Sequence, residues 1–390
     1  MMRILVPGSP IGRALVVGLV SAAVVVGCTY DFEAPFAQTP GTGAAGGGGA
    51  SAGGEGGSTS GAGGSSTSSN GSGGTSTSTS TSGTGGDGGS GGGTCVPDPV
   101  QLDIPVLNLI LLIDRSASMT QGTLWPDTVT AVSQFLSDSQ SRALYVAVNY
   151  FPAVQSTGQC QVSDYNPPHV PLTDLLNNAS VIANDVSSQF PYNGTPPAPA
   201  LEGSIDFAGA HKSQNANHEV VLAMVTDGEP TTCEQNPSVI AATVAAGVSQ
   251  HGVRTYTIGI GDVTTTYLDL LASAGDTGQG YNNKSNTLQV SASLSDIHER
   301  AFPCSYPIPT PPQGPLQPDQ VNVTYTPGGG SAQAIPHAND ENDCGNGDGW
   351  TYDSNQAPTE IHFCDSTCAD LRQDTAPQVE VLFGCPTVDN

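Results

Sequence analysis

Three oxygen-bearing side chains alternate along the chain at Asp114, Ser116 and Ser118, in the segment Asp114-Arg115-Ser116-Ala117-Ser118. Just past the end of a strand, side chains at every second position can converge on one point. Hydroxyl and carboxylate oxygens without nitrogen or sulfur partners suit hard divalent cations such as Mg²⁺. The spacing therefore predicts a metal-binding loop rather than a catalytic one.

The element that must position this loop is the apolar run Leu107–Ile113, in which only Asn108 is polar. A continuous apolar run of this length, closed by a polar turn, is typical of a strand buried on both faces. A second apolar run, His218–Thr226, ends in the same way, at Asp227-Gly228. Ligand sites in parallel sheets lie at the carboxyl ends of strands, so Asp114 and Asp227 are expected at one sheet edge.

Hydrophobic periodicity predicts strands alternating with helices between these points and beyond. Further strands are predicted at 143–151 and 254–260, and helices at 126–139, 178–190, 198–210, 238–250, 267–274 and 288–300. This alternation favours an α/β fold with a doubly wound, mainly parallel sheet covered on both faces.

A third loop, Asn193-Gly194-Thr195-Pro196-Pro197, leads into the helix predicted from residue 198. The DxSxS segment, the Thr195 loop and the Thr226-Asp227-Gly228 turn, in this order, resemble the metal-ion-dependent adhesion site of von Willebrand factor type A domains. The resemblance covers about residues 102–304. It implies a Rossmann-like fold and a complete metal set: Asp114, Ser116, Ser118, Thr195 and Asp227.

The resemblance also implies roles for these residues. The serines and Thr195 would be neutral direct ligands, and the two aspartates would bind the ion directly or through water. Mg²⁺ is the expected cofactor, with Mn²⁺ or Ca²⁺ as alternatives, and its open position would accept an Asp or Glu carboxylate from a partner protein. The competing interpretation, that Asp114 and Ser116 merely cap the following helix, does not account for Thr195 and Asp227.

For three residues near the predicted metal site we expect ordinary structural roles. We expect Arg115 to point outward, Met119 to pack in the core and Glu229 to start a helix, although Glu229 could also be an acceptor near the site.

Catalytic alternatives lack their motifs. Ser116 stands where a DxD phosphatase needs its second Asp, and the chain has no Walker A sequence and no GxSxG elbow. His298-Glu299 lacks the second His of HExxH, and Gly259-Ile260-Gly261 lacks the third Gly of a dinucleotide loop. No enzyme activity is expected.

The N-terminal segment, residues 1–28, has the pattern of an export signal. Arg3 and Arg13 precede the uncharged apolar stretch Ala14–Val26, which as a helix would reach about 20 Å, less than the roughly 30 Å of a bilayer core. Its end, Val25-Val26-Gly27-Cys28, resembles the lipobox of bacterial lipoproteins, which implies a lipid on Cys28. An ordinary signal peptide with an incidental cysteine is the alternative.

Residues 29–94 are predicted to be a disordered tether, because 39–94 contain almost only Gly, Ser, Thr and Ala. Such a stretch cannot bury enough apolar surface to offset its ordering entropy. The expected location is the bacterial cell envelope, lipid-anchored at the outer membrane or cell surface, with the head held away from the membrane.

Eight cysteines follow the tether and, in an exported protein, predict disulfides: Cys95, Cys160, Cys233, Cys304, Cys344, Cys364, Cys368 and Cys385. A Cys160–Cys233 bridge would stiffen the rim of the metal site, and Cys95 with Cys304 could tie the domain ends together. Two further bridges would then fall within the C-terminal residues. A zinc site is disfavoured because no CxxC pair occurs.

The predicted domains after the tether are a von Willebrand factor type A domain at 95–304, a proline-rich linker at 305–318 and a small cysteine-rich α+β module at 319–390. In the module we expect strands at 321–326, 360–363 and 378–383, and a short helix at 368–374. Its acidic loop, 339–350, could hold calcium through Asp340, Asp343 and Asp348, but a solvated turn is favoured.

The net charge is −26, with nine basic and 35 acidic residues. Such a surface repels nucleic acid, so the partners expected are an extracellular or envelope protein and, through Cys28, a membrane. The sequence thus favours a surface-anchored, metal-dependent adhesion protein. The alternative is a non-adhesive envelope scaffold in which the metal is only structural.

Overall fold

The structure is a computed structural model that describes residues 95–154, 159–345 and 347–389. The predicted signal segment, the Cys28 anchor and the tether lie outside the described residues. Within the described ranges, no helix is both long enough and apolar enough to cross a membrane.

A six-stranded sheet in the order β4-β3-β2-β5-β6-β7 forms the centre of the larger module. All neighbouring strands run parallel except β3 and β4. The strands are β2 Val106–Asp114, β3 Tyr145–Phe151, β4 Val170–Asp174, β5 His218–Thr226, β6 Arg254–Gly259 and β7 Tyr281–Asn282. The predicted doubly wound, mainly parallel α/β fold is confirmed.

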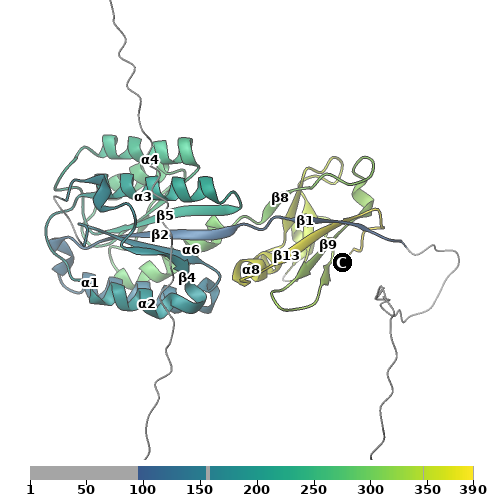
Figure 1. Cartoon of the computed structure of the whole chain (residues 1–390), viewed down its shortest axis with the longest axis horizontal. Coiled ribbons are helices and arrows are strands. Elements are labelled where there is room, and N and C mark those ends of the chain that lie inside the picture. The colour runs from purple at the N-terminus through teal and green to yellow at the C-terminus, as the bar shows by residue number, and fades with distance from the viewer. Residues whose placement is uncertain (1–94, 155–158, 346, 390) are drawn as a thin grey trace, which may run out of the picture. The chain divides into compact units, whose positions relative to one another are not determined.

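Both faces of this sheet are covered by helices, as Figure 1 shows for β2 and β5, which lie between α3 and α4 on one side and α1 and α2 on the other. One layer contains α1 Leu124–Ser137, α2 Leu175–Ser188 and α6 Val290–Ala301, and the other contains α3 Pro197–Gln214, α4 Pro237–His251 and α5 Thr265–Ala274. In β2, Leu109, Leu111 and Ile113 pack into the first layer, and Ile110 and Leu112 pack into the second. Each such side chain contributes about 1.5–3 kcal/mol when fully buried.

The edge strand β4 was not predicted, because prolines interrupt its sequence. Pro171 lies within it, and Pro167 and Pro168 precede it. Proline is tolerated at a sheet edge, where one side of the strand needs no hydrogen-bonded partner. The prolines in the local sequence therefore argue against a strand here, but the position of β4 at the edge of the sheet permits one.

Strand β2 lies at the switch point of the sheet, because the chain continues to β3 on one side and reaches β5 on the other. The register pairs Ile113 with Val225, so Asp114 and the Thr226-Asp227 turn emerge side by side. This is the location at which open α/β sheets bind ligands.

The C-terminal module contains two small antiparallel sheets, in the orders β1-β13-β9-β10 and β11-β12-β8. Their strands are β1 Asp98–Leu102, β8 Ser305–Pro307, β9 Val321–Thr326, β10 Gln333–Ile335, β11 Trp350–Tyr352, β12 Glu360–Phe363 and β13 Gln378–Phe383, with helices α7 Glu341–Cys344 and α8 Asp365–Gln373. The three strands predicted here match β9, β12 and β13 residue for residue. Trp350 is fully buried, which fits a core role.

Strand pairing differs from the predicted domain boundaries at two places. Residues 98–102, assigned to the first domain, form β1 and pair with β13 of the C-terminal module. Residues 305–307, assigned to the linker, form β8 and pair with β12. In both cases a short strand finds its partner far along the chain, which a local pattern does not reveal.

All eight predicted cysteines form disulfides, but the pairing corrects part of the prediction. Cys160–Cys233 is present as expected, whereas Cys95 bonds Cys385, Cys304 bonds Cys368 and Cys344 bonds Cys364. The expected Cys95–Cys304 tie was wrong because β1 pairs with β13, which brings Cys95 to Cys385 instead. Only Cys344–Cys364 lies wholly within residues 319–390.

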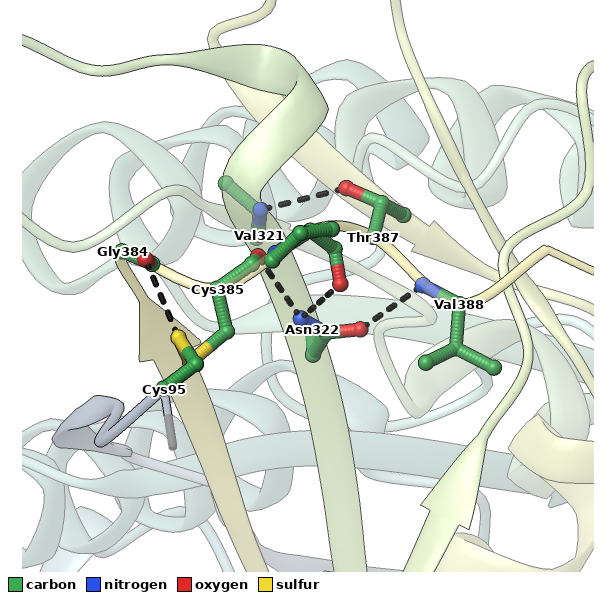
Figure 2. Close-up of a disulfide and its surroundings, with 8 residues drawn as sticks. Cys95, Val321, Asn322, Gly384, Cys385, Thr387 and Val388 are labelled. Atoms are coloured by element: carbon green, nitrogen blue, oxygen red, sulfur yellow. Dashed lines mark hydrogen bonds between the residues drawn. A yellow bond between two sulfur atoms is a disulfide. The ribbon is translucent and has the colours of Figure 1, made fainter. Parts of the chain in front are cut away.

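Figure 2 shows the Cys95–Cys385 bridge next to Asn322 of β9. The Asn322 amide donates to the carbonyls of Cys385 and Pro386 and accepts from the backbone N–H of Val388. These bonds hold the segment after β13 against β9, so the two ends of the described chain are fastened to one sheet.

The acidic loop of this module is organised as a helix start. Asp340 accepts hydrogen bonds from the backbone N–H groups of Asn342 and Asp343, which caps α7. Asp343 accepts from the Asn339 amide. These hydrogen bonds give Asp340 and Asp343 structural roles in the turn, as the favoured interpretation of the loop expected.

Candidate metal centre

Four of the five predicted site residues meet at the carboxyl ends of β2 and β5. The Ser118 hydroxyl donates to Oδ1 of Asp227 at 2.9 Å, and the Ser116 and Ser118 hydroxyl oxygens lie 2.9 Å apart. A hydroxyl has one proton, and Ser118 uses its proton on Asp227. Ser116 is therefore the donor to Ser118, and the chain of hydrogen bonds runs from Ser116 through Ser118 to Asp227.

Asp114 is fully buried at the base of this cluster. The Ser116 backbone N–H donates to its Oδ1 at 2.8 Å, and the Thr226 hydroxyl donates to its Oδ2 at 2.6 Å. Burial and the neighbouring Asp227 charge raise the pKa of Asp114 to about 7, against the lowering effect of these hydrogen bonds. Burial likewise raises the pKa of Asp227. Two carboxylates are thus held together where positive charge would stabilise them.

Thr195 reaches the same place through backbone contacts between loops. Its N–H donates to the Thr231 hydroxyl at 2.9 Å, and its carbonyl accepts from the Thr231 N–H at 3.0 Å. On the other side, Ala117 N–H donates to the carbonyl of Asn193 at 2.9 Å. The Thr195 loop is therefore fastened to both aspartate loops.

A cavity of about 600 Å³ opens where these loops meet, and Ser118, Thr195 and Asp227 all line it. Gly261, at φ +58°, lies in its wall, and a Cβ there would stand 3.1 Å from both Asp227 Cβ and Leu124 Cδ1. A side chain at Gly261 would push against the residue that must face the cavity. The glycine keeps that space open.

The residues present fit a hard divalent cation. The oxygens of Ser116, Ser118 and Asp227 lie next to one another, and Mg²⁺ and Ca²⁺ both prefer such oxygen-only surroundings. The described ranges contain no cluster of three or more His, Cys, Asp or Glu side chains suited to a metal, so the donor set here is hydroxyl-rich with two carboxylates.

Arg115 corrects the prediction, because it points inward and is only 2% exposed. Its Nε donates to the carbonyl of Pro152 at 2.9 Å and an Nη donates to the carbonyl of Ala153 at 3.0 Å. The guanidinium lies 4.4 Å from the centre of the Tyr192 ring. Its charge is therefore used to hold the loop after β3, and does not face the two aspartates.

Of the other two neighbouring residues, Met119 lies as predicted and Glu229 does not. Met119 is fully buried in the core, as predicted. Glu229 does not start a helix, since α4 begins at Pro237; instead it lines the cavity and accepts from the Thr264 hydroxyl at 2.6 Å. Asp262, which also lines the cavity, was missed, although it follows the end of β6 closely and the strand-end argument would have found it.

Comparisons with known proteins agree with this geometry at the level of the domain. Residues 108–298 match the family model of the von Willebrand factor type A domain. A search of curated proteins found no match.

Three solved structures resemble the chain loosely. They are the pilus adhesin SpaC from Lactobacillus rhamnosus GG in its open conformation (14% identity, 73% of this chain and 39% of that chain, TM-score 0.41), proximal thread matrix protein 1 from the mussel byssus (18%, 54% and 51%, 0.37) and the manganese-loaded TRAP protein of Plasmodium vivax (15%, 69% and 97%, 0.36). This chain thus spans well under half of the pilus adhesin, and at these scores the likenesses carry no functional argument. The family match, the sheet order and the loops at its carboxyl edge agree: residues 108–298 form a von Willebrand factor type A domain.

Proposed function

We propose that this domain binds a divalent cation through Asp114, Ser116, Ser118, Thr195 and Asp227, and that the bound cation takes an Asp or Glu carboxylate from a partner protein. The observation that carries the proposal is the chain of oxygens from Ser116 through Ser118 to Asp227, at 2.9 Å spacings beside the cavity. Mg²⁺ is the expected ion, and Mn²⁺ or Ca²⁺ are the alternatives, because all three accept oxygen ligands.

The ligand chemistry supports binding of an external carboxylate. Ser116, Ser118 and Thr195 offer neutral oxygens, so only Asp114 and Asp227 supply negative charge to a doubly charged ion. A cation with few charged ligands and a position facing a cavity remains attractive to an anionic oxygen. The cavity gives a partner side chain access to that position.

Binding rather than catalysis is the function that this site supports. Activated nucleophiles and general bases require a base held against the attacking group. The described lining residues offer hydroxyls, carboxylates and glycines, together with Gln121, Leu124 and Pro230, and none of them is His, Cys or Lys. The Ser116 hydroxyl is hydrogen-bonded to that of Ser118, and the Ser118 hydroxyl to Asp227, which orients these two groups.

The proposal includes a lipid anchor on Cys28 at the bacterial cell surface, supported by the position of Cys28 after the apolar stretch 14–26. Cys28→Ser should abolish labelling by a clickable palmitate analogue and release the protein from the membrane fraction. Unchanged labelling would contradict the anchor without bearing on the metal site.

Titration calorimetry with MgCl₂ and MnCl₂ tests the metal site. Wild type should bind one cation, whereas Asp114→Ala and Ser118→Ala should each weaken binding at least tenfold, because each removes a proposed ligand or its support. Ser137→Ala, an exposed serine of α1, is the matched control and should bind as wild type does. Wild type that binds no better than Asp114→Ala would end the proposal.

Partner capture with and without EDTA separates adhesion from the scaffold alternative. Capture lost in EDTA and restored by Mg²⁺ supports a metal-mediated contact. Capture that ignores EDTA, in a protein that the calorimetry shows to bind metal, would favour the scaffold in which the ion is only structural.

A further inference from the structure

A second polar cluster lies at the opposite edge of the sheet from the proposed Mg²⁺ site, near the amino ends of β2 and β5. It contains Asn108, the polar residue within the apolar run of β2, which is fully buried. His218, the first residue of β5, and His211, in the last turn of α3, complete the cluster. None of these three residues takes part in the proposed Mg²⁺ site.

The two imidazole rings meet through one nitrogen each. His211 Nε2 lies 3.1 Å from His218 Nδ1, and the ring centroids are 5.1 Å apart. The Asn108 amide nitrogen also lies 3.1 Å from His218 Nδ1, but its two protons have acceptors in the carbonyls of Val106, at 3.0 Å, and Glu219, at 3.2 Å. His211 is therefore the donor to His218, and His218 is neutral because its Nδ1 accepts.

The surroundings of both rings favour the neutral form. Burial lowers the pKa of His211, and burial followed by the His211 charge lowers the pKa of His218. The cations beside the cluster, Lys212 and Arg254, are both paired with Glu219, at 2.8 Å and 3.4 Å. Neutral imidazole is the form in which histidine binds a metal ion.

The cluster also contains a hydrogen-bond acceptor that no protein group satisfies. Oδ1 of Asn108 is buried and has no donor among the described residues. A buried carbonyl oxygen without a donor is costly, and an apolar side chain at this position would avoid that cost. A ligand that brings its own donor, such as a water molecule bound to a metal ion, would satisfy the oxygen.

One ion can contact both rings. Zinc–nitrogen distances are about 2.0–2.1 Å, so a single ion reaches two nitrogens that lie up to about 4 Å apart. The 3.1 Å between His211 Nε2 and His218 Nδ1 is within that limit. Both rings are partly exposed, which leaves them open to an ion from solvent. No third His, Cys, Asp or Glu forms a metal-binding group with them in the described ranges, so water would fill the remaining positions.

We propose that His211 and His218 together bind a transition-metal ion of the Zn²⁺, Cu²⁺ or Ni²⁺ class. The ion takes the place of the hydrogen bond between the rings, and His211 then carries its proton on Nδ1 instead of Nε2, so both rings stay neutral. Imidazole ligands suit these ions, whereas hydroxyl and carboxylate ligands suit Mg²⁺. The two edges of the sheet thus select different metals.

Calorimetry on the full chain, purified without a histidine tag and with MgCl₂ present throughout, tests this site. The wild type should bind one Zn²⁺ per chain. His211→Gln and His218→Gln, which keep hydrogen-bonding side chains, should each weaken Zn²⁺ binding at least about tenfold, because each removes a ligand. His362→Gln is the matched control and should bind Zn²⁺ as wild type does. His362 is partly exposed and lies 3.3 Å from a Glu360 carboxylate oxygen, so it is the competing two-ligand position.

Electron paramagnetic resonance of the Cu²⁺-loaded wild type makes the test independent of how well the variants fold. It should show hyperfine splitting from two imidazole nitrogens. Splitting from fewer than two nitrogens overturns the proposal, and so does a wild type that binds no Zn²⁺. Zn²⁺ binding that persists in both histidine variants, or that is lost in His362→Gln, overturns it as well. The Mg²⁺ site is tested separately, by Asp114→Ala.

Discussion

The place of Arg115 in the fold is the one that its sequence position suggests least. It stands between the first two residues of the metal loop, yet its side chain turns away from them and binds the carbonyls of Pro152 and Ala153. Its own backbone carbonyl accepts from the N–H of Tyr192, and the Tyr192 ring lies under the guanidinium. A buried cation is costly unless its donors are satisfied, and here backbone carbonyls and an aromatic face satisfy them.

Replacement of Arg115 by Ala should lower the free energy of unfolding by about 2–4 kcal/mol, because it removes the donor to the buried carbonyl of Pro152 and opens a cavity. The Ala153 carbonyl keeps the Tyr192 hydroxyl as a donor. The replacement should also weaken Mg²⁺ binding, since the neighbouring Ser116 loses its support. Chemical denaturation and calorimetry measure the two effects.

Lys284→Ala, which removes an exposed cation, is the control and should stay within about 0.5 kcal/mol of wild type. An Arg115→Ala protein with unchanged stability and Mg²⁺ affinity would show that the loop does not depend on this anchor.

At the scale of the elements, the site is built from loops that are joined to one another. The loop after β2 is bonded to the Thr195 loop through Ala117 and Asn193, and the Thr195 loop is bonded to the loop after β5 through Thr231. The Cys160–Cys233 disulfide ties the end of that last loop to the segment after β3. The positions of the proposed ligands are therefore set jointly, because each of the three loops is bonded to at least one of the others.

Replacing Cys160 and Cys233 with Ser should weaken Mg²⁺ binding several-fold, because the loop that carries Asp227 and Thr231 gains freedom that metal binding must then remove. The bridge closes a loop of 73 residues in sequence separation, so global stability should also fall by about 3–4 kcal/mol. Calorimetry and thermal unfolding check both.

The double replacement of Cys344 and Cys364 separates these effects, since that bridge lies in the C-terminal module. It should lower stability and leave the Mg²⁺ affinity unchanged. Equal losses of affinity in both double variants would contradict a local role for Cys160–Cys233.

At the scale of the whole molecule, the C-terminal module is tied to both ends of the larger domain. Strand β1 enters its four-stranded sheet just before β2 begins, and β8 enters its three-stranded sheet just after α6 ends. His298 of α6 is 4% exposed near this junction, where it lines a small cavity with Phe302, Leu371 and Arg372. Burial first, and then the Arg372 charge, lower the pKa of His298 to about 3, against the opposing charge of Asp138.

The sign of the resulting pH dependence follows from linkage. In the unfolded chain His298 titrates near its ordinary pKa of about 6.5, so below that pH the unfolded state binds the proton and the folded state does not. This contribution to stability is complete above about pH 6.5 and should be lost, by up to about 1.4 kcal/mol per pH unit, as the pH falls towards 3.

Urea denaturation at pH 7, 5.5 and 4.5 measures this effect as the difference between wild type and His298→Leu, in which the carboxylate contributions common to both cancel. The loss of stability on acidification should be smaller in His298→Leu. His251→Leu, at the exposed end of α4, is the control and should follow the wild type. Parallel pH profiles for wild type and His298→Leu would contradict the assignment.

Much of the fold could be predicted because its signals are local. The apolar runs of β2 and β5 are long and end in polar turns, and the helix periodicity between them is regular, so the α/β class and the position of Asp114 and Asp227 at one edge followed. The strands β9, β12 and β13 likewise alternate in burial along short, well-bounded segments. Strand β4 was not predicted, because a proline argues against a strand unless the strand is known to lie at a sheet edge.

The sequence by itself predicted an oxygen-rich cluster and the two strands that carry it, because residue type, spacing and period are properties of adjacent positions. Only the tertiary structure decided that Arg115 turns inward, that Cys95 bonds Cys385 across 290 positions, and that Glu229 and Asp262 share a cavity with Asp227. These outcomes depend on which distant backbones pack together. This packing depends on the burial and hydrogen bonding of the whole chain, and a short segment does not contain that information.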